Sequence, residues 1–114
     1  MITGIHASFQ SPEAERVRTF LKDVLELPYT DIGGGFLVFD VPDAEVAVAQ
    51  TTDLAHDISF SCDDLPRTID ALKSKGVQFA NGVTEEVWGW KTLFDIPGGT
   101  RVMLYQPKYK RDPK

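Results

Sequence analysis

Short stretches of this 114-residue chain alternate between hydrophobic and polar residues, the pattern of a β-strand with two different faces. In residues 2–9, for example, Ile5 and Phe9 alternate with His6 and Ser8, which predicts a strand with His6 opposite the apolar side. Tight Pro-Gly-Gly and Pro-Asp-Ala turns separate later stretches. The predicted strands lie at 2–9, 36–41, 45–50, 57–62, 77–79, 91–95 and 100–106.

Two other stretches place apolar residues at helical spacing. The first begins at Ser11, a plausible N-cap, and ends near Glu26, since Pro28 cannot continue a helix. Asp63 or Asp64 caps the second, and Gly76 suits its C-terminal end. Their apolar stripes are Val17, Phe20, Leu21, Val24 and Leu25 in the first helix, and Leu65, Ile69 and Leu72 in the second.

The order of elements repeats, and so do some of the residues. Phe39, Asp40 and Pro42 recur 55 positions later as Phe94, Asp95 and Pro97, in the stretch Phe-Asp-Ile-Pro-Gly-Gly before the last strand. Ser8-Phe9 recurs as Ser59-Phe60, 51 positions later, and this register places Asp57 opposite His6. The sequence therefore predicts a duplicated fold of mixed α+β class.

Charge and composition exclude several functions. The net charge is −5, and four of the basic residues lie in a short tail at 108–114. An acidic body disfavours nucleic acid, whose phosphates require a basic surface. Cys62 is the only cysteine, which excludes a disulfide framework, and no apolar stretch has the length of a membrane helix. We therefore expect no nucleic-acid or membrane partner, and a cytoplasmic location.

Several motifs together resemble a known superfamily. They are Asp-Ile-Pro-Gly-Gly at 95–99 before an alternating strand, Lys-Gly-Val-Gln-Phe at 75–79, His-Asp-Ile-Ser-Phe-Ser-Cys-Asp-Asp-Leu at 56–65, Trp-Gly-Trp at 88–90 and Leu-Tyr-Gln-Pro at 104–107. Over about residues 2–107 the chain resembles the vicinal oxygen chelate superfamily, which includes glyoxalase I, extradiol dioxygenases and bleomycin-resistance proteins. The later motifs are similar to a small, uncharacterised branch of it.

The resemblance implies a fold for this chain. Two tandem β-α-β-β-β modules, at 1–50 and 56–107, would form an open curved barrel around a cavity, with the helices outside. Together they would make a single domain at 1–107, followed by the basic tail at 108–114. The resemblance also implies a homodimer.

The resemblance also locates the superfamily's metal ligands on inward strand faces. The corresponding positions are His6, Asp57, Met103 and Ala47, or Ala49 in a shifted register. Alanine donates nothing to a metal, and a thioether is a poor ligand for hard ions. Met103 also replaces the glutamate that acts as general base in glyoxalase I. A metal site would therefore have to be rearranged around His6 and Asp57, and the pattern assigns no definite cofactor.

The cavity that these faces imply is aromatic and acidic. Its predicted lining is His6, Ser8, Asp57, Ser59, Trp88, Trp90, Met103 and Tyr105. Aromatic rings suit a planar or cationic small molecule, so the first expectation is a small-molecule binding protein without the usual metal site. The alternatives are a metal-dependent lyase or dioxygenase with a site on His6 and Asp57, and a structural module whose cavity has no ligand.

Overall fold

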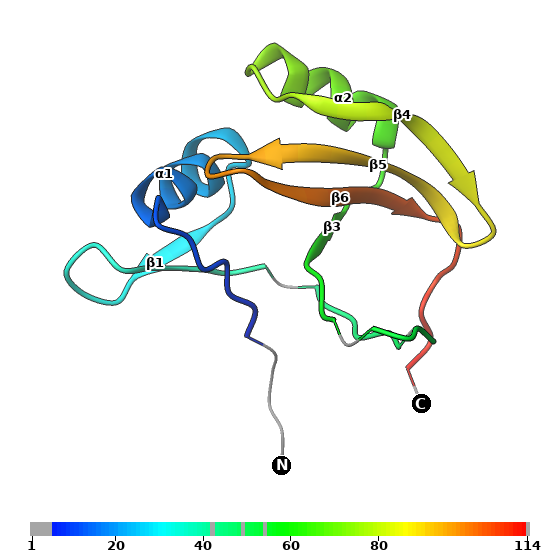
Figure 1. The fold of residues 1–114 in the computed structure, drawn as a ribbon, viewed down its shortest axis with the longest axis horizontal. Coiled ribbons are helices and arrows are strands. Elements are labelled where there is room, and N and C mark those ends of the chain that lie inside the picture. The colour runs from blue at the N-terminus through cyan, green and yellow to red at the C-terminus, as the bar shows by residue number, and fades with distance from the viewer. Residues whose placement is uncertain (1–5, 42, 49, 54, 114) are drawn as a thin grey trace. The chain divides into compact units, whose positions relative to one another are not determined.

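The computed structural model describes residues 6–41, 43–48, 50–53 and 55–113. The chain divides into two compact units, residues 1–57 and 58–114. The fold is of mixed α+β class, with one helix and one sheet in each unit (Figure 1). No helix in the described parts of the chain is long and apolar enough to cross a membrane.

The first unit begins with the predicted helix, divided into α1 (Ala14–Thr19) and a π-helical turn, η1 (Phe20–Val24). The prediction of Ser11 as the N-cap is wrong, since Glu13 occupies that position and no side chain caps the helix. The hydroxyl of Ser11 instead accepts a hydrogen bond from the backbone N–H of Glu13 (3.0 Å) in the turn before the helix. Within the predicted apolar stripe, the side chains of Val17 and Leu21 are buried. The chain then leaves the helix at Glu26, whose φ of 56° lies in the left-handed region.

Two short strands, β1 (Tyr29–Asp31) and β2 (Leu37–Phe39), form an antiparallel pair after this helix. The prediction of strands at 2–9 and 45–50 is wrong over residues 6–9, 45–48 and 50, which have no strand, while 2–5 and 49 lie outside the described residues. The physical reason is pairing, since alternation makes a strand only where another strand satisfies its backbone. Val46 and Val48 are 76% and 96% exposed.

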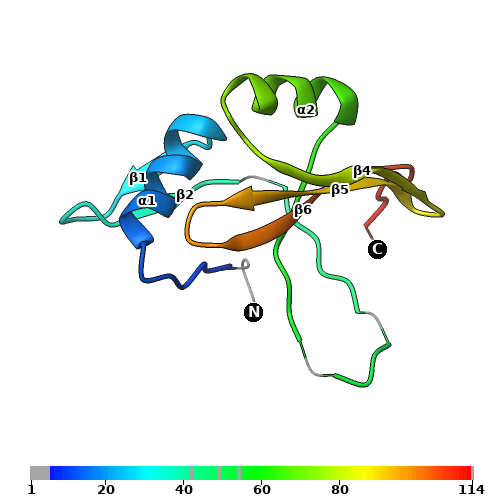
Figure 2. The ribbon, with the colours of Figure 1, turned by 45° about the horizontal axis from the view of Figure 1, so that its top comes forward.

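The second unit contains a four-stranded sheet in the order β3-β6-β5-β4. β3 pairs parallel to β6, and the other neighbours are antiparallel. The strands are β3 (Ser59–Ser61), β4 (Phe79–Glu86), β5 (Gly89–Ile96) and β6 (Thr100–Pro107). One helix, α2 (Leu65–Ser74), lies over one face of this sheet (Figure 2).

Both ends of α2 carry the signals that the sequence predicts. The Asp64 carboxylate accepts a hydrogen bond from the backbone N–H of Arg67 (3.1 Å), and Gly76 ends the helix with a φ of 88°. A side chain of the sheet adds a contact that the sequence does not reveal. The Gln106 amide oxygen accepts the backbone N–H of Leu65 (2.8 Å), and so joins the start of α2 to β6.

The core of the second unit lies between α2 and the sheet. Phe94 and Leu65 are each 1% exposed, and the strand residues around them alternate between buried and half-buried. The buried members on the sheet are Thr92, Phe94, Ile96, Val102 and Leu104. The helix therefore covers one face of β5 and β6. The residues that alternate with the buried ones lie on the other face.

Strand β4 is longer than the strand predicted at 77–79, and it contains Asn-Gly, a dipeptide typical of tight turns. Asn81 and Gly82 lie inside β4, where the register with β5 shifts between Ala80 and Thr84. Asn81 has a φ of 62°, so the turn residues make a bulge instead of reversing the chain. The reversal comes later, at residues 87–88.

Two contacts recur at equivalent places in the units. One is a ring pair across each hairpin, and the other is a backbone hydrogen bond from the aspartate that follows the second ring to the residue that precedes the first ring. The hydrogen bonds run from Asp40 N to Pro28 O (2.8 Å) and from Asp95 N to Gln78 O (3.0 Å). The ring pairs are Tyr29 with Phe39 (6.1 Å) and Phe79 with Phe94 (5.9 Å). Part of the repeat in the sequence is thus a repeat of local structure.

Candidate functional site

The face of the four-stranded sheet that α2 does not cover brings three of the predicted residues together. Met103 on β6 lies directly opposite Ser59 on β3 and Leu93 on β5, and Tyr105 lies two residues along the same strand. We call this surface the Met103 face; on β3, β5 and β6 it consists of Ser59, Ser61, Lys91, Leu93, Asp95, Arg101, Met103 and Tyr105. Its centre is apolar and its edges are polar.

The two tryptophans of the predicted lining lie in different surroundings. Trp88 stands in the turn before β5, and its ring meets Tyr105 edge to face with 5.7 Å between centroids. Trp90 lies within β5 opposite Gln106, and alternation places it on the helix side. The ammonium nitrogen of Lys108 lies over the Trp90 ring, 4.8 Å from the ring centroid. The two rings differ because β5 begins at Gly89, so that Trp88 lies outside the strand and only Trp90 follows its alternation of faces.

The charges of the Met103 face are paired. The Arg101 Nε donates a hydrogen bond to the Asp95 carboxylate (2.8 Å), and the Lys91 ammonium lies 3.3 Å from Glu86. The hydrogen bond from Arg101 lowers the pKa of Asp95 below its usual value of 3.8. The carboxylates of Asp95 and Glu86 thus each lie beside a cation. Asp57, the acidic residue of the predicted lining, belongs to the first unit.

The residues of this face do not fit a divalent metal. Ser59 and Leu93, the cross-strand neighbours of Met103, contribute no carboxylate, imidazole or thiolate. Among the described residues, no group of three or more His, Cys, Asp or Glu is placed to hold a metal ion. A metal site here would need donors from elsewhere.

Three of the predicted cavity residues belong to the first unit by the division of the chain. His6, Ser8 and Asp57 are exposed, and none lies in a helix or strand. Asp57 comes two residues before β3, so continued alternation would place it on the side of Ser59. Whether these residues share a cavity with the Met103 face stays a prediction.

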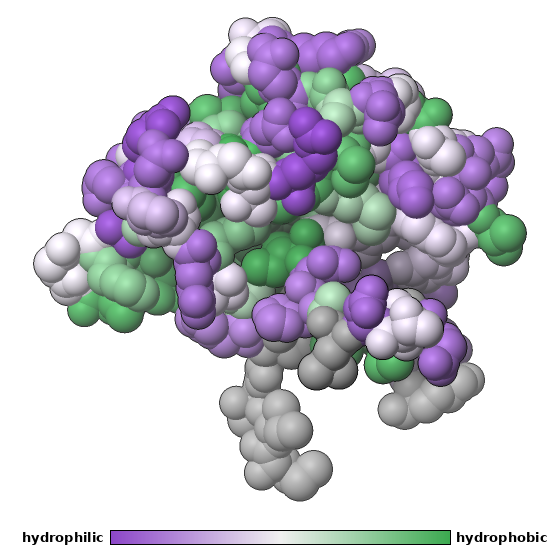
Figure 3. Space-filling view, viewed as in Figure 1, coloured by the Kyte–Doolittle hydropathy of each residue, from purple (hydrophilic) through white to green (hydrophobic). Residues whose placement is uncertain are grey.

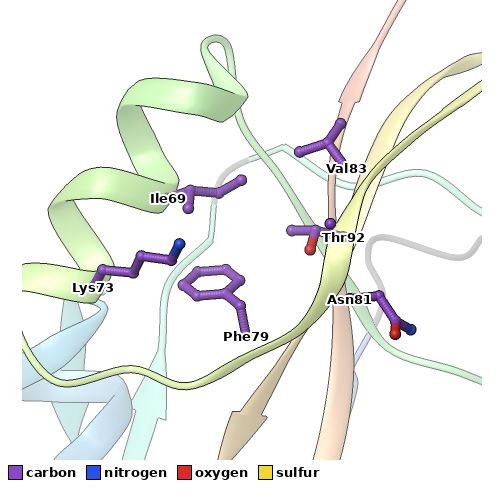
Figure 4. Close-up of a pocket in the computed structure, with 7 residues that line it drawn as sticks. Ile69, Lys73, Phe79, Asn81, Val83 and Thr92 are labelled. Carbon is purple, nitrogen blue, oxygen red and sulfur yellow. The ribbon is translucent and has the colours of Figure 1, made fainter.

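A pocket of about 250 Å³ lies on the opposite, helix-covered side of the second unit (Figure 4). Its lining is Ile69, Lys73, Phe79, Asn81, Gly82, Val83 and Thr92, and none of these was predicted as a site residue. Cys62 is half-buried directly after β3 and belongs to neither surface. Burial raises the pKa of its thiol, and its Sγ lies 3.6 Å from the carbonyl oxygen of Tyr105.

Some residues of the Met103 face that were not predicted could have been found from the sequence. Ser61 follows Ser59 at the strand period of two, so alternation alone places it on the Met103 face. Lys91 and Leu93 belong there only because β5 pairs with β6 in one particular register. A one-residue slip would move both to the other side.

No protein-family model matches the sequence, and no curated protein matches it. Solved structures match over nearly the whole chain. The antibiotic-binding protein TnmS3 from Streptomyces sp. CB03234 has a TM-score of 0.67 at 19% identity, covering 95% of this chain and 100% of its own. A member of the glyoxalase/bleomycin resistance protein/dioxygenase superfamily from Sphaerobacter thermophilus DSM 20745 has a TM-score of 0.65 at 20% identity, covering 92% and 98%.

An enzyme structure matches less closely. The lactoylglutathione lyase from Agrobacterium tumefaciens has a TM-score of 0.56 at 14% identity, covering 84% of this chain and 87% of its own. At such identities the similarity extends to the fold alone. The chain therefore has the fold of the glyoxalase/bleomycin resistance protein/dioxygenase superfamily, the vicinal oxygen chelate superfamily that its motifs resemble.

Proposed function

We propose that this protein binds a small planar, aromatic molecule on the Met103 face and does so without the metal site usual in the superfamily. The observation that carries the proposal is the position of Met103, which has Ser59 and Leu93 as cross-strand neighbours. Methionine provides an adaptable apolar contact at the place where metal-dependent relatives would need a carboxylate. The antibiotic-binding activity named for TnmS3, a structural neighbour, is consistent with this proposal.

The chemistry of the face favours an aromatic ligand over a cation. Tyr105 lies two residues from Met103 on β6, and its ring contacts that of Trp88. Such rings contribute large contact areas. The carboxylates of Asp95 and Glu86 are already paired with Arg101 and Lys91, so the second unit's part of the surface has little attraction for a cation. His6, Ser8 and Asp57 complete the cavity in this proposal, as the superfamily resemblance implies.

We also propose that the chain is one domain at 1–107, built from tandem β-α-β-β-β modules at 1–50 and 56–107 around an open curved barrel. The equivalent Asp40 and Asp95 hydrogen bonds support this arrangement. The basic tail at 108–114 lies outside it. The proposed location is the cytoplasm, consistent with the single cysteine.

A homodimer is part of the proposal, because the first unit leaves apolar side chains exposed. Ile32 and Phe36, which flank the β1–β2 loop, are 64% and 56% exposed, and hydrophobic surface is visible around this loop (Figure 3). A second copy that covered this surface would remove apolar area from water. Sedimentation of the purified protein tests this part, since a monomer at micromolar concentration contradicts it.

The binding proposal is tested by titrating the tag-free protein with a panel of planar aromatic and quaternary ammonium compounds. Tryptophan fluorescence and thermal shift report binding, since a ligand at 100 times its dissociation constant adds about 2.7 kcal/mol of stability. Met103→Lys should abolish the response to aromatic compounds. Val87→Lys places the same charge on a 96% exposed turn residue and should leave the response unchanged.

Two results would count against the proposal: no compound shifts the melting temperature, or both lysine variants bind as the wild type does. Metal analysis distinguishes the metal-free binding protein from the alternative, a metal-dependent lyase or dioxygenase. Stoichiometric metal that is lost on His6→Ala and on Asp57→Ala would favour the rearranged metal site and overturn the metal-free one.

A further inference from the structure

We propose a second binding site, for a small carboxylate with an apolar body, in the pocket between α2 and β4. This pocket lies within the second unit on the side of the sheet opposite the Met103 face. Its volume of about 250 Å³ suits a molecule of the size of benzoate. The site shares no residue with the proposed ligand surface and stands independently of it.

The pocket exists because β4 bulges away from β5. Ala80 pairs with Leu93 and Thr84 pairs with Lys91, so three residues of β4 face the single residue Thr92. Asn81, with its φ of 62°, allows the strand to arch. The arched residues 81–83 line the pocket from the side of β4, and Ile69 and Lys73 line it from α2.

The walls of this hollow are mainly apolar. Ile69 comes from α2, Phe79 begins β4, and Val83 ends the arch, while the buried Thr92 forms part of the lining from β5. Figure 4 shows the Ile69 and Phe79 side chains directed into the space between the helix and the strand. An apolar body that enters the pocket would leave water and contact these side chains.

One cation stands at this apolar surface. Lys73 follows Ile69 by four residues on α2, so the two side chains lie on the same side of the helix. Its ammonium reaches toward the Phe79 ring (Figure 4), and it makes no ion pair with any residue in the described parts of the chain. An ammonium beside apolar walls selects a ligand that joins a carboxylate to a hydrophobic group.

An NMR titration with sodium benzoate at constant ionic strength tests the site in the full chain. We expect amide shift changes that cluster at Ile69, Lys73, Phe79, Val83 and Thr92. Benzamide, which has the same shape without the charge, should bind at least tenfold more weakly. Lys73→Met should weaken the binding of benzoate by a similar factor, because Met keeps most of the apolar side chain but removes the ammonium.

The matched control is Arg67→Gln, which removes one positive charge from the same helix outside the pocket. It should leave benzoate binding within twofold of the wild type. The site is overturned if benzoate causes no saturable shifts, if the shifts map to the Met103 face, or if both variants weaken binding equally. Equal weakening would mean that benzoate responds only to the overall charge.

Discussion

Trp88 and Tyr105 meet edge to face with 5.7 Å between their ring centroids, although one lies in a turn and the other in the last strand. The contact links the β4–β5 turn to the Met103 face at its polar end. Such a ring pair contributes about 0.5–1.5 kcal/mol beyond the area it buries. The pair therefore both stabilises the turn and, in our proposal, provides the aromatic wall of the ligand site.

Trp88→Ala and Trp90→Ala should have different effects. Trp88→Ala should lower the free energy of unfolding by about 1 kcal/mol and remove the response to aromatic ligands. Trp90→Ala removes a helix-side ring and its Lys108 contact, so it should lower stability without a direct effect on that response. Urea unfolding and ligand titration of both variants check this. Equal loss of ligand response in two folded variants would contradict the assignment of faces.

Gly89→Ala should be strongly destabilising. A Cβ at this position would lie 2.3 Å from the carbonyl oxygen of Gln106, which belongs to the backbone of the paired strand and cannot rotate away. We expect a loss of about 2–4 kcal/mol from the distortion of the β5–β6 pair. Chemical denaturation measures the loss.

Gly82→Ala is the control for Gly89→Ala, because its added Cβ would meet nothing within 4 Å. It should change stability by less than about 1 kcal/mol. If both alanine variants cost the same, close packing at Gly89 is not the cause.

Glu26→Gly should stabilise the first unit. Glu26 has a φ of 56°, where a side chain is strained and glycine is not, so the gain should reach up to about 1 kcal/mol. Lys75→Gly is the comparison, since Lys75 also follows a helix but has a φ of −97° and should lose stability as glycine. Thermal unfolding of both variants gives the signs. Destabilisation by Glu26→Gly would show that the contacts of Glu26 outweigh its strain.

The Asp95–Arg101 pair should make stability sensitive to acid. Because its pKa is lowered in the folded protein, the contribution of the Asp95 carboxylate is fully present above the unfolded value of 3.8. It is lost as the pH falls through the lowered folded pKa. An NMR titration of Asp95 should give a pKa below 3.8 in the wild type and closer to 3.8 in Arg101→Gln. The same midpoint in both proteins would contradict this role of Arg101.

The sequence by itself determined the features that depend on near neighbours. Asp64 and Gly76 bound α2 as predicted, since caps act within one turn, and strict alternation placed Met103 and Tyr105 on one face of the last strand. The motifs also resembled a superfamily, and solved structures of its members share the fold of this chain.

Only the tertiary structure decided what depends on pairing between distant strands. Residues 6–9 and 45–48 alternate like strands but have no strand structure, because alternation cannot provide a hydrogen-bonding partner. The register of β5 against β6 brought Leu93 beside Met103, and the bulge at Asn81 opened the pocket under α2. These relationships join residues far apart in the chain, and no local pattern of side chains specifies them.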